Sequence, residues 1–334
     1  MKPIIPLCIV ALLALAVVAP LAAQSTEPEV PEVVFPLTLE DETGTEITLE
    51  SPAERILCLS IACLDFLYSL EITPAGMTDL LTIPYALHFG ELTEDQTIIE
   101  GGMTPDVEQI AAMEPDLIIG QAGFFDPLRP ALESVAPMYL SFPNTLEETI
   151  AQFEDVAAMT NHAADAFEVV ERFNARLGAY AEAVEDEDVS LMIVFGAAEN
   201  ETMFLEAASG QTCDMLSPIA ECLFDVPEGA GGMAAFGYDF FSMEAILEAD
   251  PDVIFFSGYN PDRTENDEVL QRLAEDPLWN ALSAVEGEEV YNIEPWVWRA
   301  GRGLAFLEVT LDQFMTTVFA ETFPKPLELD EEGE

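Results

Sequence analysis

The strongest constraint on the fold is a short motif that the chain contains twice with the same internal spacing. The first copy covers residues 106–119 and the second covers residues 242–255. Each copy begins with a residue that favours a helix start, Asp106 or Ser242. A short helical segment follows, then an acid–Pro–Asp turn that a helix cannot cross. The apolar run after the turn is typical of a strand buried on both faces of a parallel sheet. Two such units predict two similar α/β lobes.

The stretch between the two halves has apolar residues at helical spacing from residue 163 to 184 and predicts one long helix. We therefore expect two Rossmann-like α/β lobes joined by a single long helix, with a ligand cleft between them, because ligands bind beyond the carboxyl ends of parallel strands. The expected parts are a signal peptide (1–23), a disordered linker (24–36), an N-terminal lobe (37–160), the linking helix (161–187), a C-terminal lobe (188–323) and an acidic tail (324–334).

The first 23 residues have the features of a secretory signal. Lys2 precedes an apolar run over residues 4–18, and small residues lead to Ala23, after which we expect cleavage. An uncleaved anchor is the alternative, but the run is shorter than the ~20 apolar residues that a membrane span needs. Cys8 lies inside the apolar run, so we expect no lipoprotein anchor. These features predict a periplasmic or secreted protein.

The composition is strongly acidic, with 64 Asp and Glu residues against 10 Lys and Arg and a net charge of −54. Nucleic acids and anionic lipids bind clustered basic residues, so the charge excludes them as partners. The acids are spread along the whole chain, which favours a solvated acidic surface suited to high salt. A cationic ligand is the alternative interpretation.

The cysteines indicate disulfides in an exported protein. Cys58, Cys63, Cys213 and Cys222 follow the expected cleavage site, and four cysteines allow three pairings. We expect the two local pairs, Cys58 with Cys63 and Cys213 with Cys222. Neither spacing resembles a zinc-binding C-x-x-C motif, so we expect no metal site.

Segments that follow the predicted strands supply the candidate cleft. Arg299 and Arg302 flank Gly301 beside two tryptophans, a pattern that favours binding of an anion or a carboxylate; salt bridges to nearby acids are the alternative. Residues 82–96 are expected to form a loop at the cleft. The candidate ligand-binding residues are Tyr85, His88, Phe124, Phe125, Tyr238, Tyr259, Trp296, Trp298, Arg299 and Arg302.

Signatures of catalysis are weak. The chain has two histidines and no G-x-S-x-G motif. We therefore expect no enzyme, no catalytic residues and no cofactor.

Several motifs, taken in order, resemble a known family. They are the hairpin residues Asp41, Gly44 and Leu49, the segment 52–56, both copies of the repeat, the segment 276–279 and the loop 296–303. Together they resemble the periplasmic substrate-binding proteins of ABC importers in the iron-siderophore and cobalamin class, over about residues 37–320.

The resemblance implies a monomeric binding protein that delivers a metal chelate to an ABC permease and its ATPase. A ferric siderophore is the favoured ligand, with haem or a corrinoid such as cobalamin as alternatives in which His88 would ligate the metal. Glu108 and Glu244 match the glutamates that dock onto permease arginines, although acids at helix starts also stabilise the helix alone. A sensor or interaction protein with the same fold, or a tetrapyrrole chelatase, are the alternative functions.

Overall fold

The N-terminal half is built on a parallel sheet with the strand order β5-β4-β3-β6-β7. The computed structural model describes residues 32–197, 202–226, 232–257 and 266–328, so the predicted signal peptide lies outside the described residues. The strands are β3 (Ile56–Cys58), β4 (Gly76–Thr78), β5 (Thr97–Ile99), β6 (Leu117–Gln121) and β7 (Met138–Ser141). Since the chain leaves β3 toward β4 and returns to β6 on the other side, the topological switch point lies between β3 and β6.

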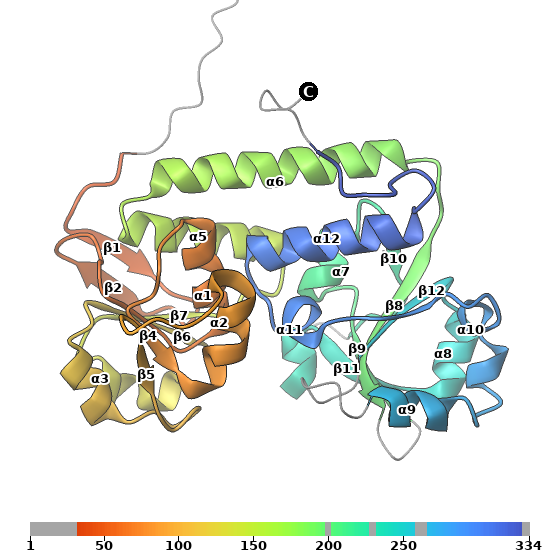
Figure 1. Ribbon diagram of the computed structural model, residues 1–334, viewed down its shortest axis with the longest axis horizontal. Helices are drawn as coiled ribbons and strands as arrows, with labels where there is room; N and C mark the ends of the chain where they lie inside the picture. Colours follow the sequence, from red (N-terminus) through yellow and green to blue (C-terminus); the bar gives the residue numbers. More distant parts are fainter. Residues whose placement is uncertain (1–31, 198–201, 227–231, 258–265, 329–334) are drawn as a thin grey trace, which may run out of the picture. The chain divides into compact units, whose positions relative to one another are not determined.

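Helices connect these strands, and a separate hairpin precedes them (Figure 1). The hairpin pairs β1 (Leu37–Glu40) with β2 (Glu46–Leu49). The helices are α1 (Ile61–Ser69), η1 (Asp79–Leu81), α2 (Thr82–Phe89), α3 (Val107–Met113), η2 (Asp126–Leu128), α4 (Arg129–Leu132) and α5 (Leu146–Met159). The helix α2 corrects the first part of the loop expected over residues 82–96. Pro84 and Tyr85 are its buried residues, with Tyr85 in the core, whereas Ile83 and Leu87 are exposed.

The C-terminal half has a mixed sheet with the order β11-β9-β8-β12-β13, and β10 also pairs with β8. Its strands are β8 (Ser190–Ala197), β9 (Thr202–Glu206), β10 (Glu221–Cys222), β11 (Tyr238–Ser242), β12 (Val253–Ser257) and β13 (Val290–Asn292). Strands β8, β12 and β13 are parallel, whereas β9 is antiparallel to both β8 and β11. The two lobes are therefore similar in class but differ in the strands beyond β8.

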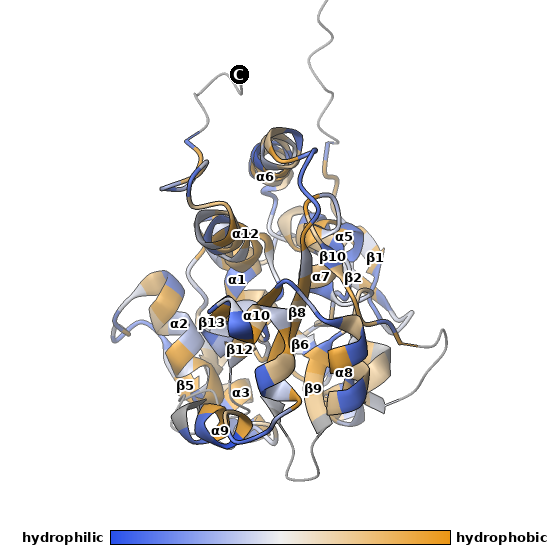
Figure 2. Ribbon diagram, turned by 90° about the vertical axis from the view of Figure 1, so that its right-hand side faces the viewer, coloured by the Kyte–Doolittle hydropathy of each residue, from blue (hydrophilic) through white to orange (hydrophobic). Residues whose placement is uncertain are grey.

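The helical elements of this half are shorter, apart from the last. They are α7 (Gln211–Leu216), η3 (Gly232–Phe236), α8 (Met243–Ala249), α9 (Asn266–Leu273), η4 (Trp279–Ala281), α10 (Ser283–Glu286), α11 (Pro295–Trp298) and α12 (Leu304–Val318). In Figure 2 strand β9 is largely hydrophobic, whereas helices α8 and α9 carry both hydrophobic and hydrophilic residues. The buried residues of β8 and β12 belong alternately to two core clusters, one on each face of the sheet.

The repeated motif forms equivalent structures in both halves. The N-caps Asp106 and Ser242 accept first-turn backbone amides, and the short helices α3 and α8 end at residues with left-handed backbone conformation. After each proline, Asp116 or Asp252 accepts backbone N–H groups at the start of the lobe's first strand, 62 residues earlier in the chain. The spacing that the two copies share thus fixes how each helix–turn–strand unit is attached to its sheet. Glu108 and Glu244 occupy equivalent, exposed positions in the first turns of the two helices.

One long helix, α6 (Ala163–Ala183), joins the halves as expected. It packs against α5 and against α12, where Asp312 accepts hydrogen bonds from Arg176 and Tyr180 of α6. Figure 1 shows α6 running alongside both α5 and α12. Among the described helices, none combines the length and the apolar composition that a bilayer crossing requires.

Candidate functional site

A cavity of about 380 Å³ lies between the two lobes, beyond the carboxyl ends of β3 and β6. This volume is at the lower end of the ~300–1,000 Å³ typical of small-molecule sites. The N-terminal lobe contributes the turn after β3, the segment after β6 and the end of β7. The C-terminal lobe contributes η3, the start of β11 and the segment from α11 to α12. The lining residues are Ser60, Ile61, Ala62, Gln121, Phe124, Ser141, Phe142, Met233, Phe236, Tyr238, Pro295, Trp296, Arg299, Ala300 and Arg302.

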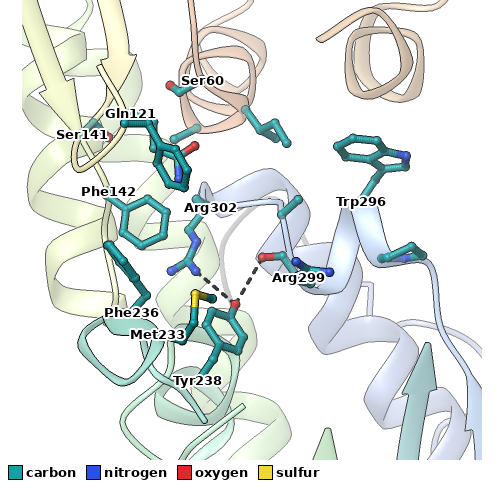
Figure 3. Close-up of a pocket in the computed structure, with 15 residues that line it drawn as sticks. Ser60, Gln121, Ser141, Phe142, Met233, Phe236, Tyr238, Trp296, Arg299 and Arg302 are labelled. Atoms are coloured by element: carbon teal, nitrogen blue, oxygen red, sulfur yellow. Dashed lines mark hydrogen bonds between the residues drawn. The ribbon is translucent and has the colours of Figure 1, made fainter. Parts of the chain in front are cut away.

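Arg302 is the central polar group of the cavity (Figure 3). Its side chain is buried, and its guanidinium carbon lies 4.1 Å from the ring centre of Phe142. Nη1 donates to the carbonyl of Pro143 at 2.8 Å and Nη2 donates to the Tyr238 hydroxyl at 3.0 Å. Nε is buried and has no partner among the described residues. The hydrogen bonds of Arg302 to described residues thus go to neutral groups, while the buried Glu206 attracts it electrostatically without a hydrogen bond between them in the described chain.

Tyr238 connects the two arginines. Its hydroxyl donates to the backbone carbonyl of Arg299 at 3.3 Å while it accepts from Arg302. Burial raises the pKa of Tyr238 to about 12, so the phenol stays neutral at physiological pH. The guanidinium of Arg299 lies 5.6 Å from the ring centre of Phe204. The arrangement places two cationic side chains against aromatic rings on one side of the cavity, as cation–π contacts favour.

Aromatic side chains form the wall of the cavity opposite Trp296 (Figure 3). Phe142 of the N-terminal lobe and Phe236 of the C-terminal lobe meet edge to face, with ring centres 4.8 Å apart. Phe124 and Met233 are 49% and 44% exposed, so they are available to contact a ligand or to close over it. The cavity therefore offers an apolar wall and a cationic floor, which suit an anion with an organic shell.

One of the two disulfides braces a segment of the site. The structure pairs Cys58 with Cys63 and Cys213 with Cys222, the two local pairs. Cys58 ends β3 and Cys63 lies in the first turn of α1, so the first bridge encloses the cavity-lining turn 60–62. Ser60 caps α1 by accepting the backbone amide of Cys63 at 3.2 Å. This turn is consequently fixed by a covalent link and by a helix cap.

The loop that carries the arginines is fixed by close packing. A Cβ atom at Gly301 would lie 2.5 Å from Phe306, so a larger residue cannot fit without moving the loop or α12. At the start of α12, the backbone amides of Ala305 and Phe306 both donate at 3.0 Å to Asp65 of α1. Asp65 is fully buried and belongs to the other lobe. The N-terminal lobe thus caps the helix that follows the arginine loop.

Five of the sequence-predicted ligand residues line the cavity: Phe124, Tyr238, Trp296, Arg299 and Arg302. Tyr259 lies outside the described residues. The other four, Tyr85, His88, Phe125 and Trp298, do not line the cavity.

Tyr85, Phe125 and Trp298 are buried in the hydrophobic core, which corrects their assignment to the cleft. Trp298 stacks on Phe255 with ring centres 4.5 Å apart, because it projects from α11 away from Trp296. His88 also lies away from the cavity. Its ring stacks against Tyr68, and its Nε2 is 3.7 Å from Asp65.

Phe142, Met233 and the buried acid Glu206 were not among the residues predicted from the sequence. Phe142 directly follows a buried strand, which is the position from which the other lining residues were inferred. Glu206 ends the otherwise apolar run of β9, and an acid in that position is a signal of a special environment. Among the described residues, no group of three His, Cys, Asp or Glu side chains is arranged to hold a metal ion.

Comparisons with known proteins agree with this architecture. The sequence profile of the family described as "Periplasmic binding protein" matches residues 61–296. The chain is 25% identical over 284 residues to the Fe(3+)-citrate-binding protein YfmC of Bacillus subtilis, covering 84% of this chain and 85% of the relative. It is 24% identical over 277 residues to the cobalamin-binding protein of Halobacterium salinarum strain R1, covering 77% and 69%.

Among solved structures, Staphylococcus aureus SirA complexed with staphyloferrin B superposes with a TM-score of 0.67. The match has 14% identity and covers 85% of this chain and 98% of that one. This likeness supports the fold of two lobes around a cleft.

Proposed function

Since the chain belongs to the periplasmic binding protein family, we propose that it is an extracytoplasmic substrate-binding protein of an ABC importer whose cleft takes up a compact, anionic ferric chelate. The relatives named for ferric citrate and cobalamin support a chelate as the class of ligand. It acts by binding and delivery and catalyses no reaction.

The observation that carries the choice of an anionic ligand is the buried guanidinium of Arg302. The chain has a net charge of −54, so its surface repels anions as a whole. The cavity nevertheless presents Arg302 with neutral partners, and Arg299 beside it. A carboxylate-rich ferric chelate supplies carboxylate oxygens to the guanidinium groups of this floor, and its carbon skeleton packs on Phe124, Phe142 and Trp296.

The size of the cavity separates the candidate ligands. A volume of about 380 Å³ suits a ferric carboxylate or another small siderophore. A corrinoid with its nucleotide loop needs much more room. His88, the residue expected to ligate haem or cobalamin, is packed between aromatic rings outside the cavity. We therefore favour a compact ferric chelate over haem and cobalamin.

Tryptophan fluorescence tests this function directly, because Trp296 lines the cavity while Trp279 and Trp298 are buried. Titration with ferric citrate, a ferric catecholate, haem and cobalamin should give quenching with the ferric citrate. Trp296→Phe should lose most of the quenching yet bind the same chelate by calorimetry. If none of the four compounds quenches the fluorescence at low or high salt, the chelate function is refuted.

Arginine variants test the anionic class. Arg302→Gln should weaken ferric citrate binding by roughly 10- to 100-fold, since a hydrogen bond to a charged group contributes about 1.5–3 kcal/mol. Arg172→Gln on α6 removes the same charge from an exposed position outside this cavity and should leave affinity unchanged. Arg302→Lys, which keeps the charge, serves as a second variant should the glutamine disturb packing. Equal affinities of the Arg302→Gln variant and the unmodified protein would exclude binding of an anion at the cationic floor.

The two exposed glutamates of the repeated motif are the proposed contact with the permease. Glu108 and Glu244 lie at equivalent positions in α3 and α8, one in each lobe. Their side chains make no contact with the cavity, so they are free to serve a second surface. We propose that they pair with arginines of the permease when the loaded protein docks.

A further inference from the structure

Glu206 is a buried acid directly behind the cavity floor. It is the last residue of β9, it is 2% exposed, and it pairs across the sheet with Tyr238 of β11. Oε1 accepts the backbone amides of Thr212 at 2.6 Å and Cys213 at 3.3 Å, in the first turn of α7. Oε2 is buried and has no partner among the described residues. The carboxyl group is therefore held on one oxygen only.

The close fit around Glu206 shows that its position is specified by the fold. A Cβ atom at Gly210 would lie 2.5 Å from Cγ of Glu206, so only glycine leaves room for this side chain. Thr212, which Glu206 holds, and its neighbour Gln211 in turn contact the arginine loop. Gln211 donates to the carbonyl of Arg302 at 3.1 Å, and Thr212 donates to the carbonyl of Trp298 at 3.2 Å.

The charged and titratable groups that interact with Glu206 all belong to the cavity. Arg302 attracts the ionised carboxylate, and Tyr238 carries the hydroxyl that Arg302 contacts. Arg299 acts on the same Tyr238 from the end of α11. On the neighbouring elements, Asp214 of α7 accepts from the start of α5, and Asp239 of β11 accepts the amide of its own next residue.

Burial is the dominant influence on this acid. It raises the pKa of Glu206 to about 7, while Arg302 and the two backbone amides act in the opposite direction. Near neutral pH the group is thus divided between the carboxylate and the neutral acid. In the carboxylate form its negative charge partly cancels the charge of Arg302, and in the neutral form it does not.

We propose that Glu206 sets the charge of the cavity floor and takes up a proton from solvent when an anionic chelate binds at Arg302. In this step the protein, with Glu206 as a carboxylate, binds the chelate and one proton from solvent. The complex then holds Glu206 as a carboxylic acid. The ligand's negative charge replaces the carboxylate as the counter-charge of Arg302. The inference rests on the proposed function, since it requires an anionic ligand at this site.

Binding must then depend on pH in one direction. A complex that holds one proton more than the free protein becomes weaker as pH rises. With Glu206 half ionised near pH 7 in the free protein, the affinity should fall about tenfold between pH 6 and pH 8. Proton uptake should approach about 0.9 per chelate at pH 8 and about 0.1 at pH 6. Glu206→Gln should remove both effects and bind at pH 8 as the unmodified protein does at pH 6.

Calorimetry with ferric citrate, in two buffers of different ionisation enthalpy between pH 6 and pH 8, measures affinity and proton uptake together. Ferric citrate changes its own protonation in this range, so each value is taken relative to Glu206→Gln in the same solutions. Asp155→Asn is the matched control. Asp155 is another acid whose pKa burial raises, and it is bonded to Tyr139 outside the cavity.

The outcomes are distinct. The inference is supported if the affinity falls with pH, and proton uptake rises with pH, more steeply in the unmodified protein and in Asp155→Asn than in Glu206→Gln. A constant affinity ratio between the unmodified protein and Glu206→Gln across this pH range overturns it and leaves Glu206 as a structural cap of α7. Equal proton uptake by the unmodified protein and Glu206→Gln at pH 8 also overturns the inference. Absence of ferric citrate binding at every pH instead refutes the proposed function.

Discussion

The cost of burying Glu206 should be visible in the stability of the protein without any ligand. Burial raises the pKa of Glu206 from its ordinary value of 4.5 to about 7. Between these values the native protein keeps a proton that the unfolded chain has released. Stability therefore falls as pH rises through this window, because stability rises with pH only where the unfolded state binds more protons.

The magnitude follows from the shift. Each pKa unit corresponds to 1.36 kcal/mol, so the free energy of unfolding should lose roughly 3 kcal/mol between about pH 4.5 and pH 7 and then remain level. Glu206→Gln has no charge to bury. It should match the unmodified protein near pH 5 and exceed its stability by roughly 3 kcal/mol at pH 8.

Urea unfolding of both proteins at half-unit steps from pH 4.5 to pH 8.5 measures this difference. The remaining acids contribute equally to both curves and cancel in the subtraction. A difference in unfolding free energy that stays constant over the range would show that Glu206 ionises at an ordinary pKa. In that case the charge behind the arginines would be permanent, and the reasoning about the cavity floor would be wrong.

Three further predictions follow from other contacts. Asp65→Ala leaves two amides of α12 without an acceptor and should lower the free energy of unfolding in urea by roughly 2–3 kcal/mol. Asp65→Asn keeps an acceptor oxygen and should lower it less. Equal losses of stability in the two variants would exclude the cap. Replacing Cys58 and Cys63 together with serine should cost about 2 kcal/mol by loop entropy and weaken ferric citrate binding, and an unchanged unfolding midpoint would argue against the brace. Replacing Glu108 and Glu244 with lysine should stop uptake by the reconstituted importer without changing the affinity for the chelate. A control variant with a charge reversal on α6 should keep its uptake. Equal uptake by the two variants would exclude docking through these glutamates.

The periodic patterns of the sequence were sufficient to predict two α/β lobes and the long helix that joins them. The repeated motif predicted the α3–β6 and α8–β12 units, because capping residues, proline and apolar runs act locally. The helical spacing over residues 163–184 predicted the long helix α6, observed as Ala163–Ala183, whereas the part assigned to the linking helix, 161–187, is longer at both ends. The antiparallel strand β9 was not predicted, although it follows β8 closely in the sequence. Its pairing with β11 could not be predicted, because those two strands are distant in the sequence.

The site was predicted only in part, because neighbouring aromatic residues face in different directions. Phe124 is 49% exposed at the cavity, whereas Phe125, the next residue, is 1% exposed in the core. Trp296 and Trp298 are two positions apart in a helical turn and so project to different sides. Residue type and order along the chain carry no information on which member of such a pair faces the ligand.

The cap that Asp65 provides across the lobes has a mechanical consequence. The start of α12 belongs to the chain of the C-terminal lobe, yet two of its amides are bonded to α1 of the N-terminal lobe. Arg302, just before it, is bonded to the carbonyl of Pro143 on the same side. A rotation of one lobe against the other that keeps these bonds must pivot at this joint. In such a rotation Arg302 would stay close to the pivot, while the exposed side chains of Phe124 and Met233, one from each lobe, would change their separation.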